Sequence, residues 1–148
     1  MISDLQAAAD SIGVKIDVLY ANTNAGIDDA FAALAQRRTD ALLVQNLFFF
    51  RDRRTQILTL AARHAIPVIY GGRADVEAGG LMSYGPNNAD VNRQFGIYIG
   101  RVLKREKPSD LPVMQSTRFE FLINLQTAKS FGIEVPPTLL ALADEVIE

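Results

Sequence analysis

The start of the chain passes from a helical to a strand-like pattern of apolar residues at a single glycine. Leu5 to Ser11 has the spacing of a helix, and Gly13 suits a C-terminal stop. Val14 to Tyr20 alternates between apolar and polar positions and is rich in β-branched residues, which is typical of a strand. The pattern therefore predicts a helix followed directly by a strand.

The next part of the chain continues this alternation of helices and strands. A helical face is formed by Ile27, Phe31 and Leu34, and a second helix is predicted from Arg53 to His64. Between them, Ala41–Val44 is uniformly apolar, which is typical of a strand covered on both faces. Another apolar strand follows at 68–70. The βαβαβ order predicts an α/β fold with a parallel sheet and right-handed crossovers.

A short stretch bounded by glycines follows the strand at Val68–Tyr70. This strand ends in Gly71-Gly72-Arg73, and Leu81–Tyr84 is strand-like again. Because parallel strands need a crossover of about a dozen residues or more, the loop between them is too short for an ordinary helical crossover. Gly85-Pro86 then stops the second stretch. A strand of this kind is what a chain needs when it leaves one lobe and enters another.

The second half of the chain predicts one long helix and several short elements. The long helix runs from Asn88, its predicted N-cap, to Lys104. Its apolar face consists of Val91, Phe95, Ile99 and Val102. Further elements are a half-exposed strand with Phe119, Phe121 and Ile123, a short helix that stops at Gly132, and a last helix from Thr138 to Leu142.

Composition narrows the range of functions. The chain has 148 residues, of which 49% are hydrophobic, so a substantial core is expected. A net charge of -2 without a long basic run argues against nucleic acid as a partner. The absence of cysteine excludes thiolate metal sites and thiol nucleophiles, and the single His64 excludes a multi-histidine metal site. No apolar run approaches the length of a membrane span, and the start is unlike a signal peptide.

No motif in the sequence indicates catalysis. His64 ends an apolar helical face, where packing or capping is its expected role. The segments Gly71–Ala74 and Glu77–Gly80 have neither the spacing of a P-loop nor that of a dinucleotide-binding loop. No cofactor or metal is expected, and the chain is not predicted to be an enzyme.

Polar and aromatic residues gather at the ends of the predicted strands. Because the carboxyl ends of parallel strands meet at one edge of a sheet, where open α/β folds bind ligands, these residues are expected to lie together. Arg73 supplies a cation that could pair with a ligand carboxylate. The predicted ligand-binding residues are Asn22, Gln45, Asn46, Phe48, Phe49, Tyr70, Arg73, Ser83 and Tyr84. The set suits binding of a small polar ligand rather than chemistry.

Several longer segments resemble a family of ABC-transporter substrate-binding proteins. The segments that carry this resemblance are Asp40–Val44, Ala61–Pro67, Glu77–Pro86, Lys107–Val113, Phe119–Lys129 and Pro136–Ile147. The resemblance implies a type I periplasmic binding fold of two lobes, with ligand trapped between them and three strands crossing the hinge. It also implies a small-molecule ligand such as an amino acid, in some members an aromatic one, an ABC permease as partner, and a periplasmic location for the intact protein.

The resemblance covers only the C-terminal portion of such a protein. Family members are roughly twice as long, so the chain is expected to be a truncated, Rossmann-like second lobe with extra C-terminal helices and a strand. On this view residues 1–84 form the second-lobe sandwich without its first strand. Residues 85–148 would contain the hinge crossings, the long helix and elements that pack on the missing first lobe. Where members often have Asp-Pro before an aromatic pair, this chain has Leu47-Phe48.

A long helix without its first lobe would expose its apolar face to water. Leaving four large side chains exposed would forgo roughly 6–12 kcal/mol. A homodimer or a domain-swapped pair is therefore expected, in which this helix and an open sheet edge meet a neighbouring chain. Two alternatives remain at this point, namely a small stand-alone α/β enzyme or regulatory domain of flavodoxin-like type and an interaction module that uses the long helix as its partner surface.

Overall fold

A computed structural model describes residues 2–148 as an α/β fold built on one five-stranded sheet. The strands lie in the order β1-β2-β3-β4-β5. The first three are parallel to one another, β4 runs antiparallel to β3, and β5 is parallel to β4. The strand bounds are β1 Leu42–Leu43, β2 Val68–Tyr70, β3 Met82–Pro86, β4 Phe119–Asn124 and β5 Glu145–Ile147.

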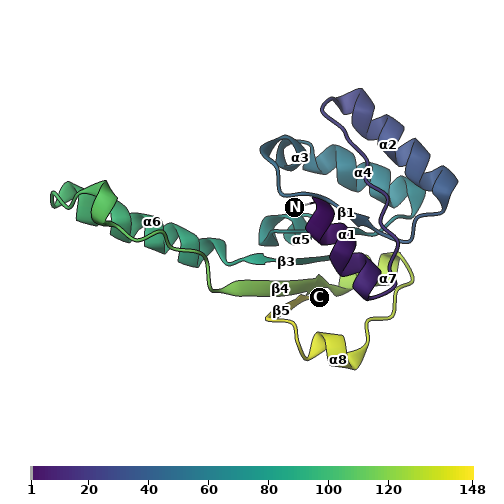
Figure 1. Ribbon diagram of the computed structural model, residues 1–148. Coiled ribbons are helices and arrows are strands. Elements are labelled where there is room, and N and C mark those ends of the chain that lie inside the picture. The colour runs from purple at the N-terminus through teal and green to yellow at the C-terminus, as the bar shows by residue number, and fades with distance from the viewer. Residues whose placement is uncertain (1) are drawn as a thin grey trace.

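Helices lie on both sides of this sheet and at its ends (Figure 1). The pair α2 and α4 lies side by side above β1 in this view, α1 crosses in front of the sheet, and α8 lies beyond β5. The helix bounds are α1 Ile2–Ser11, α2 Asn24–Arg37, α3 Phe48–Asp52, α4 Arg54–His64, α5 Arg73–Glu77, α6 Asn88–Leu103, α7 Leu125–Ser130 and α8 Pro137–Leu140. A 3₁₀ turn at Pro108–Asp110 follows α6.

The core forms where α2 and α4 pack on the start of the sheet. The predicted face of α2 is buried, with Ile27, Phe31 and Leu34 each at most 4% exposed. Ile57 and Ala61 of α4 meet this face and join Val68 and Tyr70 of β2 in one cluster. Local signals agree with this packing, because the Thr23 side chain caps α2 by accepting a hydrogen bond from the Gly26 N–H.

The prediction of a strand at Val14–Tyr20 is wrong, because the structure assigns no strand to these residues. The preceding helix and its stop are confirmed, with Gly13 at φ 71° and the Val14 N–H bonded to the Ala9 carbonyl. Within residues 2–148, no strand pairs with this segment. A strand needs a hydrogen-bonding neighbour as well as the alternating pattern.

The prediction that Ala41–Val44 is covered on both faces is also wrong. Only Leu42–Leu43 pair as a strand, and Leu43 is 54% exposed. β1 is the outermost strand of the sheet, with β2 as its neighbour on one side. Its outer edge therefore presents unpaired backbone groups.

Three short elements were not predicted from the pattern, namely α3, α5 and β5. The half-exposed strand predicted around Phe119–Ile123 is confirmed as β4, although its inner end is fully buried, with Leu122 and Ile123 at 0% exposure. β5 continues the sheet beyond β4, and the pairing partners of its three residues are Leu122, Ile123 and Asn124.

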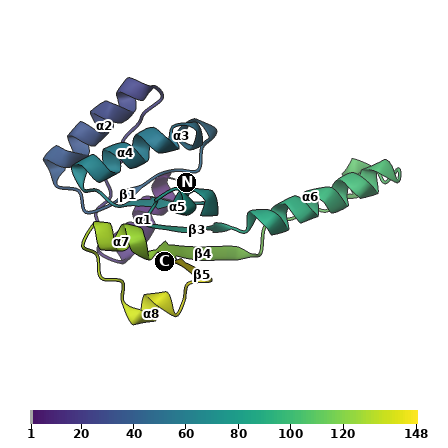
Figure 2. The ribbon, with the colours of Figure 1, turned by 180° about the vertical axis from the view of Figure 1, so that it is seen from behind.

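The helix α6 projects away from the rest of the molecule, and the chain returns beside it to β4 (Figures 1 and 2). Its N-cap is Asn87 rather than the predicted Asn88, because the Asn87 side chain accepts a hydrogen bond from the Asp90 N–H. The helix is held to the returning chain by the Tyr98 hydroxyl, which donates to the Pro112 carbonyl at 2.6 Å. Residues 87–118 are called the arm below.

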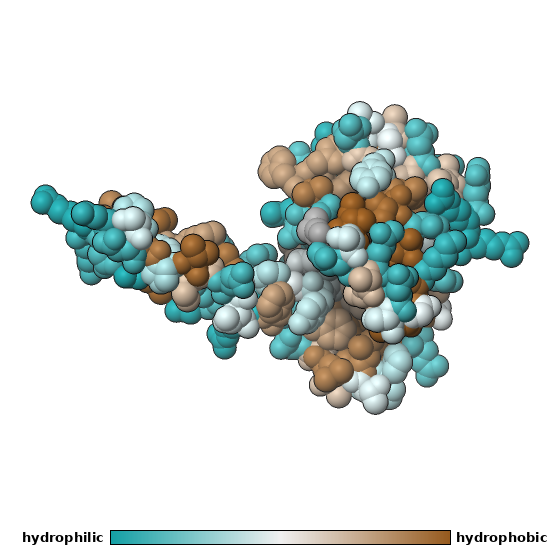
Figure 3. Space-filling model, in the orientation of Figure 1, coloured by the Kyte–Doolittle hydropathy of each residue, from teal (hydrophilic) through white to brown (hydrophobic). Residues whose placement is uncertain are grey.

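The arm leaves the predicted apolar face of α6 largely uncovered. Phe95 is 62% exposed, Ile99 60% and Val102 42%. The space-filling view shows apolar surface along the arm as well as on the lobe (Figure 3). The only residue of α6 that is buried is Asp90. Among the described residues, no helix is long and apolar enough to cross a membrane.

Candidate functional site

The carboxyl ends of β1 and β2 lead directly into two short helices at one edge of the sheet. β1 is followed by α3 and β2 by α5, and the start of α2 lies on the same side (Figure 1). β3 leaves the lobe on this side toward the arm. This place is called the carboxyl edge below, and it is where ligands bind in open α/β sheets.

The loops at this edge bring together residues that are distant in sequence. An added β-carbon on Gly71 would lie 3.4 Å from the Asn46 β-carbon, so the ends of β1 and β2 are in contact. Arg53 at the end of α3 donates from Nε to Asn24 Oδ1 at 2.6 Å, which ties α3 to the start of α2. The predicted polar residues Asn22, Gln45 and Asn46 are all exposed here.

The three consecutive phenylalanines form α3, and they divide between solvent and core. Phe48 is 79% exposed, whereas Phe49 and Phe50 are half-buried against the core cluster. The rings of Phe49 and Phe50 meet edge to face, and the guanidinium of Arg53 lies 5.7 Å from the Phe49 ring centre. α3 therefore presents one free aromatic ring beside the exposed amides.

Tyr70 and Ser83 lie inside the lobe rather than at its edge. They are paired in register on β2 and β3, and they are only 4% and 1% exposed. Neither hydroxyl has a hydrogen-bond partner among the described residues. Burial raises the pKa of the Tyr70 phenol, and the nearby Asp75 carboxylate raises it further. A direct ligand contact by either residue stays a prediction.

The ring of Tyr70 is held against Gly80 and beside a buried ion pair. A β-carbon on Gly80 would come within 2.7 Å of this ring, so no other residue type fits there without a shift. Asp75 of α5 is 5% exposed and accepts from Arg54 Nε of α4 at 2.5 Å. This pair fixes α5 on the lobe and thereby sets the position of Arg73 at its first residue.

Arg73 is surrounded by carboxylates from three elements. Its Nη2 donates to Glu145 Oε2 of β5 at 2.6 Å and lies 3.5 Å from Glu120 Oε2 of β4. Its Nη1 lies 3.4 Å from Glu77 Oε1 of α5. The hydrogen bond to Glu145 is the main reason that the pKa of Arg73 is raised. Arg73 is thus a cation at the carboxyl edge, as predicted from its position, but protein carboxylates occupy it in this state.

Tyr84 lies on the opposite face of the sheet from Ser83, because successive residues of a strand point to opposite faces. It is 66% exposed and stacks on Phe119 with the ring centres 5.6 Å apart. The Phe121 ring meets it edge to face. These aromatic residues belong to β3 and β4, the two strands that join the lobe to the arm.

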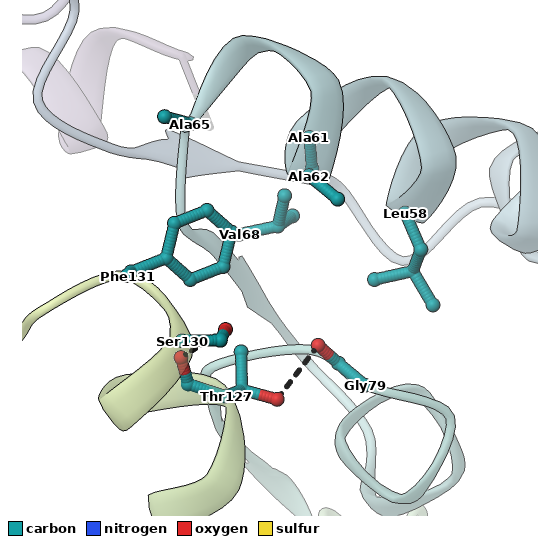
Figure 4. Close-up of a pocket in the computed structure, with 9 residues that line it drawn as sticks. All are labelled: Leu58, Ala61, Ala62, Ala65, Val68, Gly79, Thr127, Ser130 and Phe131. Carbon is teal, nitrogen blue, oxygen red and sulfur yellow. Dashed lines mark hydrogen bonds between the residues drawn. The ribbon is translucent and has the colours of Figure 1, made fainter.

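A cavity of about 310 Å³ lies away from the carboxyl edge, between α4 and α7. It is at the opposite edge of the sheet, because Val68 begins β2 and α7 follows the antiparallel β4 (Figure 4). Its lining is mostly small and apolar, and the Thr127 hydroxyl donates to the Gly79 carbonyl. Among the described residues, no group of acidic or histidine side chains could hold a metal ion.

Sequence reasoning missed three polar residues that organise the site, namely Glu120, Asn124 and Glu145. Glu120 is 9% exposed and accepts from Asn87 Nδ2 at 2.9 Å, which joins β4 to the start of the arm. Asn124 is buried, caps α7 through Thr127 and donates to the Val76 carbonyl of α5. Glu145 completes the set at Arg73. Only the capping role of an asparagine before a helix could have been read from the pattern.

The fold matches several solved structures. The chain superposes on an ABC domain from Streptococcus pneumoniae in complex with L-Trp with a TM-score of 0.90 and 25% identity, covering 99% of this chain and 49% of that one. A conserved domain protein from Vibrio cholerae gives a TM-score of 0.88 at 23% identity, with coverage of 98% and 49%. A ligand-free, open substrate-binding protein with adhesive properties from Clostridium difficile gives 0.67 at 23% identity, with coverage of 99% and 48%.

The chain therefore spans about half the length of the solved structures that it matches. No curated protein matches it. The predicted fold class, an α/β lobe of the periplasmic-binding-protein type, is confirmed. The family model described as ABC transporter substrate binding protein matches residues 1–147. The chain belongs to the ABC transporter substrate-binding protein family.

Proposed function

We propose that the chain is one lobe of the solute-binding component of an ABC importer and that it binds a small polar ligand, such as an amino acid, at the carboxyl edge. The observation that carries this proposal is the superposition on a protein in complex with L-Trp, at a TM-score of 0.90 over 99% of the chain. The family match over residues 1–147 does not favour the stand-alone flavodoxin-like alternative.

We propose that six of the predicted residues contact the ligand at this edge. Three exposed amides would hydrogen-bond polar groups, and the free ring of Phe48 would cover an apolar part of the ligand. The contacting set is Asn22, Gln45, Asn46, Phe48, Phe49 and Arg73. Tyr70 and Ser83 would support this surface from beneath, and Tyr84 would meet ligand or a second lobe on the hinge side.

Transport follows from closure of two such lobes on the ligand. A ligand that contacts both lobes stabilises the closed form, which then docks on a permease. The permease partner and a location outside the cytoplasm, normal for the family, are proposed here for the intact protein. No catalytic step is part of this function, and we propose that the chain is not an enzyme.

The 148 residues carry half of the cleft at most, since the matched structures are about twice as long. Affinity for the isolated chain is expected on the order of a millimolar rather than a micromolar. Thermal-shift measurements with a panel of amino acids test this. At ten times such a dissociation constant, a ligand adds about 1.4 kcal/mol of stability, seen as a rise of a few degrees in Tm. A panel without any rise would count against binding, and micromolar affinity would overturn the half-site account.

We also propose that a second copy covers the apolar face of the arm when the chain is alone. In an intact member of the family, we expect this face to pack against the first lobe. For the isolated chain, the large exposed side chains of α6 and the unpaired edge of β1 are the surfaces that a homodimer or domain-swapped pair would bury.

A further inference from the structure

The ion pairs of Arg73 connect the carboxyl edge with two strands near the hinge. Arg73 opens α5, directly after β2, whereas Glu120 and Glu145 belong to β4 and β5. Its guanidinium is surrounded by three carboxylates, the third being Glu77 of its own helix. Three carboxylates around one guanidinium leave an excess of negative charge.

A ligand carboxylate that approaches Arg73 in this state meets repulsion unless one of the three carboxylates moves away. The three are not held equally. Glu120 is buried, and Asn87 holds it through a second hydrogen bond. Glu145 has a side chain that is 48% exposed on a strand of three residues. Glu77 is exposed to a similar extent, but its 3.4 Å contact with Nη1 is long, whereas Glu145 fills the hydrogen-bonding position on Nη2. An exposed ion pair contributes little net free energy, even with a short contact, so a ligand carboxylate can take this position from Glu145.

The backbone of β5 does not depend on this contact. Asp144, one residue earlier, accepts from the Phe121 N–H through Oδ2 at 2.8 Å and donates its own N–H to the Phe121 carbonyl at 2.9 Å. Loss of the Glu145 carboxylate would therefore free Arg73 without detaching the strand.

We propose that Glu145 occupies the position on Arg73 that a ligand carboxylate takes, so that ligand binding exchanges one carboxylate for another. This inference rests on the function proposed above and names the ligand class as α-amino acids. The ammonium group of such a ligand would face Glu77 and Glu120, which remain beside Arg73 and balance the added charge. A plain carboxylic acid would lack this compensation, and an amine without a carboxylate would gain nothing from Arg73.

The test uses L-tryptophan as the probe, with NMR titrations that detect millimolar binding to the 148-residue chain. Glu145→Gln removes the competing charge and is expected to tighten L-tryptophan binding about two- to fivefold, the range set by an exposed ion pair. Glu134→Gln is the matched control, because Glu134 is also exposed and is not one of the three carboxylates around Arg73, and it should leave affinity unchanged. In wild type, added L-tryptophan should shift the Arg73 Nε–Hε and Glu145 carboxyl resonances together.

A double-variant cycle gives the sharpest outcome. In the background of Arg73→Gln, the gain from Glu145→Gln should vanish, and tryptamine, which lacks the carboxylate, should show no gain in any background. If L-tryptophan binds wild type and Glu145→Gln equally well, or if the gain persists without Arg73, the exchange is wrong while solute binding stands. If L-tryptophan binds none of the variants at tens of millimolar, both the exchange and the proposed function fail.

Discussion

Gly85 lies so close to Gly71 that a β-carbon on residue 85 would sit 2.1 Å from the Gly71 carbonyl oxygen. The end of β3, where the chain leaves the lobe, thus touches the loop that follows β2. This loop leads into Arg73 at the start of α5, so the backbone contact fixes the carboxyl edge against the strand that leads to the arm. Only glycine at residue 85 permits this approach.

Gly85→Ala should destabilise the lobe, because a methyl group cannot enter this contact without moving backbone. Overpacking of this kind costs on the order of 1–3 kcal/mol. Gly96→Ala is the matched control, since a β-carbon there meets nothing within 4 Å and residue 96 lies inside helix α6. It should be neutral or stabilise by about 0.5–1 kcal/mol. Urea unfolding of both variants measures the difference, and equal stability of Gly85→Ala and wild type would show that the contact is absent.

Asn87→Ala should weaken the junction between lobe and arm. The Asn87 side chain caps α6 through the Asp90 N–H and holds Glu120 through its amide nitrogen. Loss of such a cap lowers the free energy of unfolding by about 1 kcal/mol, and loss of the hydrogen bond to Glu120 lowers it further. Asn88→Ala, at the exposed first residue of the helix, should stay within about 0.5 kcal/mol of wild type. Circular dichroism during thermal unfolding compares the two, and an equal effect would contradict the assignment of Asn87 as the cap.

Asp90 should make the stability of the protein depend on acidic pH. Hydrogen bonds from Arg93 and then Gln94 hold the pKa of Asp90 below its ordinary value. A carboxyl whose pKa is lower in the folded than in the unfolded state stabilises the fold above the unfolded pKa. That contribution is lost as the pH falls through the lower, folded pKa. Asp90→Asn should therefore be less stable than wild type at neutral pH, and the gap should close in strong acid.

Urea unfolding of wild type and Asp90→Asn measures this gap. Both proteins are unfolded at neutral pH and at steps downward from pH 5, roughly the range over which such carboxyls titrate. Asp110→Asn, on an exposed turn of the arm, serves as the control for the loss of a surface carboxylate. A difference between wild type and Asp90→Asn that is constant across the whole range would contradict the role of the charge.

Phe95→Glu should convert the isolated chain from a pair to a monomer. Phe95 is 62% exposed on α6, so a carboxylate there leaves the fold intact but opposes burial against a second copy. Gln126→Glu introduces the same charge on the exposed surface of α7 and should leave the pair unchanged. Sedimentation velocity at micromolar concentration distinguishes the two, and a monomeric wild-type chain would refute the dimer.

The longer helices and the strands β2, β3 and β4 were predicted from the sequence because their patterns report burial on one face. Ile27, Phe31 and Leu34 lie on one face of their helix, so they are buried together whichever element that face packs against. The fold buries all three. The pattern at Val14–Tyr20 indicates a strand equally well, yet pairing depends on a neighbour that no local pattern specifies. The same limit applies to β5, whose three residues pair with β4 although the helices α7 and α8 lie between the two strands in the chain.

The sequence predicted where on the sheet the candidate site lies better than it predicted which side chains contact one another there. The rule that ligands meet the carboxyl ends of parallel strands located Asn46, Phe48 and Arg73 correctly at this edge. It could not show that Tyr70 points into the core, nor that Glu145 reaches Arg73 from 72 residues away. Both depend on how α5 sits over the sheet, which follows from tertiary packing.

The most direct test of the central claim is an NMR titration that maps where an amino acid binds on this chain. L-tryptophan should perturb the backbone amides of Asn22, Asn46, Phe48 and Gly72 most strongly, since these surround the carboxyl edge. The cavity at the opposite edge provides an internal comparison through Thr127, Ser130 and Phe131. Perturbations confined to the carboxyl edge would support a solute-binding lobe, whereas perturbations centred on Thr127, Ser130 and Phe131, or none at all, would contradict it.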